Sequence, residues 1–254
     1  MTEPGAVSAL WSAPARLPNL RAGEIHVFAF PLHAPAARLA ELKNLLSRDE
    51  AERAAGYLQA GDRVRYQVGR AMLRTILGRY LDLDAHELAF VYGSHGKPAL
   101  QDRGGQEHLN FNLARSGELA VLTLQLDGDI GIDLERVRQF PNALDIGKRF
   151  FAPQEHDALC SLPAAGLDAA FFSYWTRKEA VVKSIGLGLS QPMDAFALGL
   201  HPGAGGEQVI VQDTPCWVVP LPPPSGAYVA ALATLGPPRP LNCWTWRDPP
   251  TPTQ

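Results

Sequence analysis

The chain has 254 residues, a formal net charge of −3, 46% hydrophobic residues and 19% charged residues. This composition is typical of an ordinary soluble protein with one large or two small domains, and it offers no general attraction for nucleic acid or acidic membranes. Three cysteines without C-x-x-C spacing, no secretory signal pattern and no run of roughly 18 apolar residues predict a reducing, cytoplasmic location without disulfides, a zinc site or a membrane span.

The first half of the chain predicts a mixture of strands and helices. Residues 1–23 are rich in Ala, Pro and Gly and predict a loosely attached lead-in. A strand is expected over 25–30, and a helical region follows in which Ser47 and Glu50 have the spacing of a capping box. An apolar stripe predicts a helix over 62–80. Short strands separated by turns, one of them at 102–105, are then expected near 88–92, 108–113 and 119–126.

The second half repeats this plan. The sequence G-I-D-L-E at 131–135 predicts a strand, and residues 169–185 predict a helix. Further strands are expected near 193–200, 217–221 and 227–234, before an irregular, proline-rich tail at 236–254.

The two halves also share residues at similar spacing. A shift of 109 residues lays Arg74 on Lys183, and a shift of 105 lays Glu50 on Glu155. These matches suggest two copies of one α+β unit, which we place at 24–128 and 129–235. The ligand site is then expected in the cleft between them.

Two motifs in the second half carry acidic residues at spacings that bring them together. Asp133 and Glu135 are two residues apart, so on a strand they point to one face, about 6 to 7 Å apart. Trp175, Glu179 and Lys183 recur every four residues, so on a helix they share one face. Three carboxylates and one amine can therefore converge on a magnesium ion that is completed by substrate phosphates.

Either motif alone has a simpler explanation. Asp133 and Glu135 could lie on the solvent face of an edge strand, next to Arg136 and Arg138. Glu179 and Lys183 have the spacing of an ordinary solvated ion pair on a helix. The joint occurrence of both motifs favours a site.

At these residues the chain resembles the 4'-phosphopantetheinyl transferases of the two-domain, surfactin-synthetase-activating type. Their signatures have the forms G-[IV]-D-[IL]-E and W-[ST]-x-K-E-A-x-x-K, which stand here at 131–135 and 175–183. The resemblance implies a pseudodimer of two similar α+β halves, each a small, mostly antiparallel sheet packed with helices, with coenzyme A in the seam. It also implies that Asp133, Glu135 and Glu179 hold Mg²⁺.

The resemblance extends to residues expected to contact coenzyme A. Seven arginines between 48 and 79 are mostly expected to be solvated, but Arg65 stands in a context similar to the segment whose Arg meets a nucleotide phosphate. The turn G-K-P, made of Gly96, Lys97 and Pro98, would offer backbone N–H groups and an amine to phosphate or adenine, and His95 would line the same site. The motif F-N-L-A-R-S is similar to F-N-[IL]-S-H-S, and it supplies Asn112, Ala114 and Arg115 to the expected coenzyme A site.

The last motif departs from the family at two positions. Ala114 replaces a serine and loses its hydroxyl, while Arg115 replaces a histidine. Because a guanidinium stays charged and can bind bidentately, phosphate binding at Arg115 should depend little on pH.

The implied reaction is transfer of 4'-phosphopantetheine from coenzyme A to a serine of a carrier protein, with release of adenosine 3',5'-bisphosphate. Glu179 is the expected base for the serine, Lys183 would stabilise the pyrophosphate and protonate the leaving group, and Trp175 is expected to be structural. The expected partner is an apo carrier protein or carrier domain of a fatty-acid, polyketide or nonribosomal peptide synthase, as in secondary metabolism, and the chain is expected to be a monomer that binds no nucleic acid or membrane. The resemblance implies a docking surface at 136–151 and 184–191. A magnesium-dependent pyrophosphohydrolase and a non-catalytic nucleotide-binding module remain as alternatives.

Overall fold

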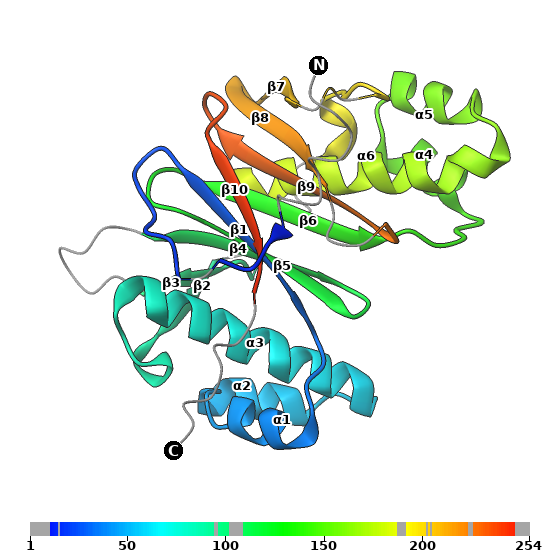
Figure 1. Ribbon diagram of the computed structural model, residues 1–254. Coiled ribbons are helices and arrows are strands. Elements are labelled where there is room, and N and C mark those ends of the chain that lie inside the picture. Colours follow the sequence, from blue (N-terminus) through cyan, green and yellow to red (C-terminus); the bar gives the residue numbers. More distant parts are fainter. Residues whose placement is uncertain are drawn as a thin grey trace.

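The computed structural model describes residues 11–14, 16–93, 96–101, 109–186, 192–201, 203, 205–222 and 226–246. They form two four-stranded sheets with helices packed on the outer side of each sheet (Figure 1). The α+β class and the arrangement in two similar halves, both predicted from the sequence, are confirmed. No helix among those described is long and apolar enough to cross a bilayer.

The first half is built on a sheet with the strand order β10-β1-β5-β4, in which β10 (Leu241–Thr245) comes from the last part of the described chain. Strand β1 (Ile25–Pro31) pairs antiparallel with β5 (Leu119–Gln125), which pairs antiparallel with β4 (Asn110–Ser116). The other elements of this half are α1 (Ala36–Lys43), α2 (Arg48–Ala55), α3 (Ala60–Leu81) and a hairpin of β2 (Phe90–Tyr92) and β3 (Pro98–Leu100).

The second half has the sheet order β6-β9-β8-β7. Strand β6 (Ile130–Arg136) is an edge strand of this sheet and pairs antiparallel with β9 (Tyr228–Leu235). The remaining elements are α4 (Ala143–Phe150), α5 (Pro153–Cys160), α6 (Ala164–Ile185), β7 (Glu207–Val211) and β8 (Thr214–Leu221).

Alternation along β1 places its side chains in two different hydrophobic cores. On β1, Phe28 and Phe30 pack in the core between the first sheet and its helices. Val27, between them, faces the other way and packs with Ile132 and Leu134 of β6 in a core between the two sheets. Each of these side chains is almost completely buried, which stabilises the fold by about 1.5 to 3 kcal/mol apiece. The two halves therefore share a hydrophobic junction.

Corresponding elements of the two halves are separated by a nearly constant number of residues. A shift of 105 residues lays the range of β1 on that of β6, and a shift of 104 lays the range of α3 on that of α6. The predicted match of Glu50 with Glu155 fits this shift, whereas the predicted match of Arg74 with Lys183 is wrong because Arg74 corresponds to Lys178. The same shift places Asp133 at the position of Phe28, so this acidic position belongs to the second half alone.

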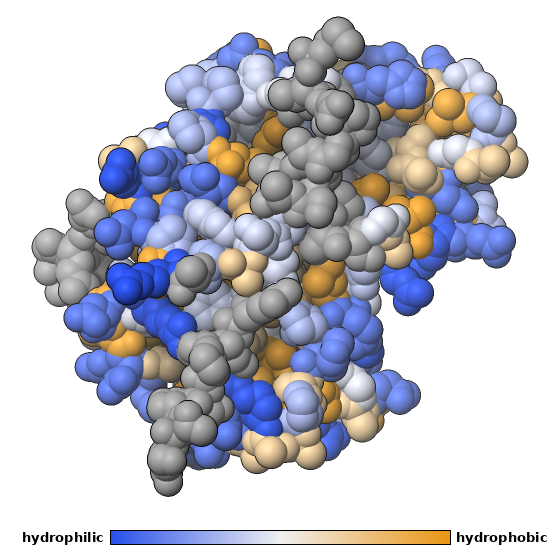
Figure 2. Space-filling view, in the orientation of Figure 1, coloured by the Kyte–Doolittle hydropathy of each residue, from blue (hydrophilic) through white to orange (hydrophobic). Residues whose placement is uncertain are grey.

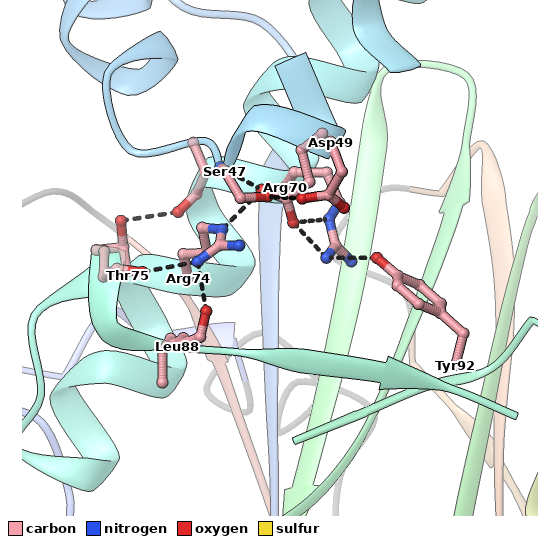
Figure 3. Close-up of polar contacts among 10 residues, drawn as sticks. Ser47, Asp49, Arg70, Arg74, Thr75, Leu88 and Tyr92 are labelled. Carbon is pink, nitrogen blue, oxygen red and sulfur yellow. Dashed lines mark hydrogen bonds and ion pairs between the residues drawn. The ribbon is translucent and has the colours of Figure 1, made fainter. Parts of the chain in front are cut away.

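A buried carboxylate fixes the long helix in each half. Glu50 accepts hydrogen bonds from Nε of Arg70 and of Arg74, each 2.7 Å long (Figure 3). It also accepts one from the backbone N–H of Ser47, at 3.0 Å, as the capping-box spacing predicts. Arg70 and Arg74 are thus buried and paired, and the expectation that they are solvated is wrong. Burial opposes ionisation of Glu50, but Arg74 and Arg70 outweigh it and hold its pKa below the usual range.

The counterpart in the second half is Glu155. It accepts from the backbone N–H of Ala152 at 2.7 Å and pairs with the fully buried Lys178 at 2.8 Å. Lys178 also donates to the carbonyl oxygens of Met193 and Phe196, each at 2.6 Å. Because Lys178 precedes Glu179, this network anchors α6 at the predicted site.

Trp11 and residues 241–245 are held by more contacts than the sequence suggests. Trp11 is only 9% exposed and packs in the core between the sheets, where Thr245 Oγ1 donates to its carbonyl oxygen at 2.7 Å. Strand β10 (Leu241–Thr245) pairs in parallel with β1. The predictions of a loose lead-in and an irregular tail are therefore wrong at these residues, because contacts distant in sequence hold both segments.

Other predictions of secondary structure differ in detail. The strand expected at 193–200 is wrong, since Met193–Ala195 form a 3₁₀ turn, in which the carbonyl oxygen of Met193 accepts a hydrogen bond from Lys178. Helices α4 and α5 and strand β7 were not predicted. The turn predicted at 102–105 lies outside the described residues.

Candidate active site

Strand β6 and helix α6 approach each other unusually closely at Gly131. A Cβ atom added at Gly131 would lie 2.1 Å from the carbonyl oxygen of Ala180 and 2.5 Å from the backbone nitrogen of Ser184. Only glycine permits this contact between backbones. The glycine of the G-I-D-L-E motif therefore sets the distance at which Asp133 and Glu135, on the same face of β6, meet α6.

Asp133 is the most deeply buried of the three carboxylates, at 7% exposure. Its Oδ1 accepts a 2.6 Å charge-assisted hydrogen bond from Lys183 Nζ. Within the described part of the chain, its Oδ2 is buried and has no hydrogen-bond partner. Burial raises the pKa of Asp133 to about 6, although Lys183 opposes the rise. A buried carboxylate with an unpaired oxygen is suited to a further cationic ligand.

Glu179 and Glu135 complete the acidic group that the two motifs predict. Burial raises the pKa of Glu179, Lys183 opposes this, and the charge of Glu135 adds to it. Glu135 Oε2 accepts a 2.8 Å hydrogen bond from Ser116 Oγ in the other half. The structure thus brings Asp133, Glu179 and Lys183 together and places Glu135 within their electrostatic field.

These carboxylates are neighbours, but they do not form a ready-made metal cage. Over the residues that the structure describes, no group of three or more His, Cys, Asp or Glu side chains is arranged to hold a metal ion. One oxygen of Asp133 is engaged by Lys183, and one oxygen of Glu135 is engaged by Ser116. The roles predicted for these residues in metal binding and catalysis stay predictions.

Side chains of β4 cover the free edge of β6 at the seam. Asn112 Oδ1 accepts a 2.8 Å hydrogen bond from the backbone N–H of Ile132, and Ser116 Oγ accepts one of 3.0 Å from that of Arg136. Ala114, between them, is 4% exposed and packs in the core between the sheets. Asn112 and Ala114 therefore lie at the seam, where they contact protein, and Ser116 joins the two halves beside Glu135.

The predicted Gly96-Lys97-Pro98 turn also lies at the seam, but Lys97 has an unexpected role. Its Nζ donates to the carbonyl oxygens of Ile130, at 3.0 Å, and of Lys183, at 2.8 Å. Gly96 has a left-handed φ of 75°, and Pro98 begins β3. The Lys97 ammonium therefore ties the hairpin to β6 and α6, whereas the sequence assigned it to phosphate or adenine. His95 lies outside the described residues.

Arg65 and Arg115 line one small cavity of about 200 Å³. Arg65 comes from the first turns of α3, and Arg115 from β4, where its guanidinium lies 5.6 Å from the ring centroid of Tyr66. The cavity is lined by Leu32, Tyr57, Asp62, Arg65, Tyr66, Arg115, Ser116 and Gly117. Because Ser116 also bonds Glu135, this cationic cavity adjoins the acidic group.

Comparisons with known proteins match both halves. A family model described as the 4'-phosphopantetheinyl transferase superfamily matches residues 129–233, and one for the N-terminal part of 4'-phosphopantetheinyl transferases matches 34–126. The 4'-phosphopantetheinyl transferase HetI of Nostoc sp. is 38% identical over 221 residues, which cover 86% of this chain and 92% of the relative. The chain belongs to the 4'-phosphopantetheinyl transferase family.

Two further relatives in this family are more distant. The 4'-phosphopantetheinyl transferase Sfp of Bacillus subtilis is 28% identical over 69% of this chain and 76% of its own length. A mouse protein, L-aminoadipate-semialdehyde dehydrogenase-phosphopantetheinyl transferase, is 28% identical over 61% of this chain and 52% of its own length. This chain is accordingly an enzyme that transfers phosphopantetheine to carrier proteins, as the sequence predicted.

The transferase also has a larger cavity that is not lined by Asp133, Glu135 or Glu179. Its volume is about 480 Å³, and its walls are mostly apolar side chains of the first half, such as Leu83 and Phe111. It meets the seam at Lys97, Asp129 and Ile130. The charged residues of the two motifs lie outside this cavity, so they, and not its volume, mark the candidate site.

Trp175 has the structural role that was expected. Its ring stacks on Phe171, with centroids 5.9 Å apart and an interplanar angle of 23°. It also meets Phe150 edge-on at 6.0 Å. These contacts hold α6 against the neighbouring α4.

Sequence reasoning missed the role of Ser116 in this transferase site. Ser116 is the last residue of the F-N-L-A-R-S motif, but no role was assigned to it. The available signal was the two-residue alternation along β4, which puts Asn112, Ala114 and Ser116 on the side of the strand that faces β6.

Proposed function

We propose that this enzyme transfers the 4'-phosphopantetheine group from coenzyme A to a serine hydroxyl of an apo carrier protein, with Mg²⁺ as cofactor, and releases adenosine 3',5'-bisphosphate. The observation that carries the proposal is the acidic group of Asp133, Glu135 and Glu179 beside an amine, with a cavity lined by two arginines next to it. Coenzyme A needs both, because it carries a pyrophosphate and a separate 3'-phosphate.

The carboxylates at the seam suit a magnesium ion that takes its remaining ligands from water and substrate phosphates, because they form no complete metal cage among the described residues. Carboxylate oxygens are the ligands that Mg²⁺ prefers, and the buried Oδ2 of Asp133 has no other partner among the described residues. Asp133, Glu135 and Glu179 would hold the ion. When bound, it would offset the charge that develops on the leaving phosphate.

The chain's own residues would carry the remaining steps. Glu179, whose burial raises its pKa, is suited to accept the proton of the attacking serine. Lys183 would neutralise pyrophosphate charge and donate a proton to the leaving group. Arg65 and Arg115 would hold the 3'-phosphate through charge-assisted hydrogen bonds.

We further propose that the carrier docks beside α4. The end of β6, the loop that follows it and α4 itself expose four basic side chains and Leu144, which is 36% exposed. The basic residues are Arg136, Arg138, Lys148 and Arg149. A basic surface with an apolar contact suits an acidic partner helix. The space-filling view is notched at its right edge, where the lobe with α4 meets the lobe with α3 (Figure 2). The second expected docking segment, 184–191, lies outside the described residues from 187 onward.

The proposal is tested by intact-mass spectrometry of purified apo carrier proteins incubated with the enzyme and coenzyme A, in magnesium and in EDTA. We expect a magnesium-dependent gain of the mass of one phosphopantetheine group. Hydrolysis of coenzyme A without modification of any carrier would instead indicate a pyrophosphohydrolase. Nucleotide binding with neither reaction would indicate a non-catalytic module.

A further inference from the structure

Arg65 is held by two carboxylates at the mouth of the small cationic cavity. Its guanidinium donates to Asp62 Oδ1 at 2.7 Å and to Glu118 Oε1 at 2.6 Å. Asp62 precedes Arg65 by one turn of α3, whereas Glu118 comes from the turn between β4 and β5. The cavity lining therefore carries two positive charges, of Arg65 and Arg115, and one negative charge, of Asp62, and Glu118 adds a second carboxylate beside Arg65.

The backbone of Glu118 is held by hydrogen bonds, whereas its side chain is more than half exposed. The backbone N–H of Leu32 donates to the Glu118 carbonyl oxygen at 2.9 Å, and the Glu118 N–H donates to Tyr228 Oη at 3.3 Å. Gly117, with φ at 55°, makes the turn that brings Glu118 to Arg65. The Glu118 side chain is 54% exposed. Because exposed ion pairs are weak, this carboxylate can leave Arg65 at little cost.

The two ligand subsites differ in what they offer an anion. The acidic group beside Lys183 suits a pyrophosphate only together with a cation, so the separate 3'-phosphate is the group left for the arginine cavity. A phosphate there meets Arg65 already occupied on two sides. A phosphate that binds both terminal nitrogens of Arg65 competes with these carboxylates, and Glu118, which comes from a separate turn, is the more exposed of the two, at 54% against 47% for Asp62.

We propose that Glu118 is an internal competitor for the 3'-phosphate, and so a residue that sets the affinity of this enzyme for nucleotides that carry it. The inference rests on the proposed function, because it takes coenzyme A as the substrate. In the free enzyme Glu118 neutralises Arg65. On binding, the phosphate replaces the carboxylate, and on product release Glu118 returns to the guanidinium. Glu118 thus weakens binding of both coenzyme A and the bisphosphate product.

The test is calorimetric binding of adenosine 3',5'-bisphosphate and of adenosine 5'-monophosphate to wild-type enzyme and to Glu118→Gln. Loss of an exposed, competing charge should tighten binding of the bisphosphate by about twofold to fivefold. Binding of the monophosphate, which lacks the 3'-phosphate, should not change. Glu52→Gln is the matched control, since Glu52 is exposed and pairs with Arg48 at 2.8 Å on the surface of α2.

A double variant connects the effect to Arg65. In the Arg65→Gln background, adding Glu118→Gln should leave bisphosphate binding unchanged, because the competition is for this guanidinium. Unchanged or weaker bisphosphate binding by Glu118→Gln alone would overturn the proposal, and so would equal tightening of both nucleotides. These results need no transfer reaction, so they are separate from failure of carrier modification by the wild-type enzyme.

Discussion

Asp133 binds Lys183 through one carboxylate oxygen, at 2.6 Å, and its other oxygen is buried without a hydrogen-bond partner among the described residues. One side chain thus anchors the amine and keeps an acceptor for another cation. Glu179 lies one helical turn before Lys183 on α6, so it reaches the same region without being part of this ion pair. The ion pair of Asp133 and Lys183 is therefore distinct from Glu179, the residue that we expect to act as base.

Glu179→Gln should therefore remove most turnover but keep nucleotide binding. The substitution removes the expected base and one expected ligand, while Arg65 and Arg115 are unchanged. We expect a fall in kcat of about 100-fold or more, with the dissociation constant of adenosine 3',5'-bisphosphate within about twofold of wild type. Carrier modification followed by mass spectrometry and calorimetry measure the two quantities. Turnover at the wild-type rate would show that the assigned mechanism is wrong.

Gly131→Ala should disrupt the junction of β6 and α6. Its Cβ would meet the carbonyl oxygen of Ala180 at 2.1 Å, so the helix must shift, which we expect to cost about 1 to 3 kcal/mol of unfolding free energy and most activity. Gly166→Ala, in the same helix, is the control, because its added Cβ meets nothing within 4 Å. Urea denaturation of both variants decides the point. Equal stability of the two variants would contradict the close contact.

Glu50→Gln should reveal how much the buried ion pairs stabilise the first half. It leaves Arg70 and Arg74 without a carboxylate, at an expected cost of about 3 to 5 kcal/mol at neutral pH. The folded pKa of Glu50 is depressed, so its contribution is present above the unfolded pKa and is lost as the pH falls through the folded pKa. The difference in unfolding free energy between wild type and variant should therefore shrink in acid. Urea titrations at pH 7 and at successively lower pH measure it, with Glu52→Gln expected to lie near wild type throughout.

The parts of the site that the sequence predicted depend on short-range periodicity. Asp133 and Glu135 share a face because strands repeat every two residues, and Glu179 and Lys183 share a face because helices repeat every 3.6. Both relations hold wherever the strand and helix form. The presence of both motifs suggested that the strand face and the helix face meet. Gly131 permits this because it lets the backbones of β6 and α6 approach closely.

The parts that could not be predicted depend on contacts between distant segments. Trp11 meets Thr245 across almost the whole chain, and β10 joins β1. No local pattern reports such pairing. Arg70 and Arg74 have the composition of a solvated helix face, and only the approach of Glu50 buries them. Lys97 likewise finds its carbonyl partners only once the halves are together.

Arg115→His should convert a pH-insensitive phosphate contact into a pH-dependent one. Arginine stays charged throughout the accessible range, whereas an unperturbed histidine loses its charge near pH 6.5. The second pKa of the ligand's own phosphates, about 6, affects both proteins alike, so we expect the ratio of variant affinity to wild-type affinity for the bisphosphate to fall between about pH 6 and 8. Calorimetry at several pH values measures both curves. Complete loss of activity in the variant even at pH 6 would show that this phosphate site is built differently from that of its relatives.

Ala114→Ser should add a hydrogen bond at the seam between the halves. Along the free edge of β6, the N–H groups of Ile132 and Arg136 bond side chains at positions 112 and 116 of β4. By strand alternation, the N–H of Leu134 points toward position 114, where alanine offers no acceptor. A serine there should stabilise the enzyme by about 0.5 to 1.5 kcal/mol in urea denaturation. Ala120→Ser is the control: Ala120 is fully buried in the core beneath the helices, so a hydroxyl there should destabilise the protein by about 1 to 3 kcal/mol. Destabilisation of both variants to the same extent would mean that the added hydroxyl at position 114 does not accept a hydrogen bond from the backbone N–H of Leu134.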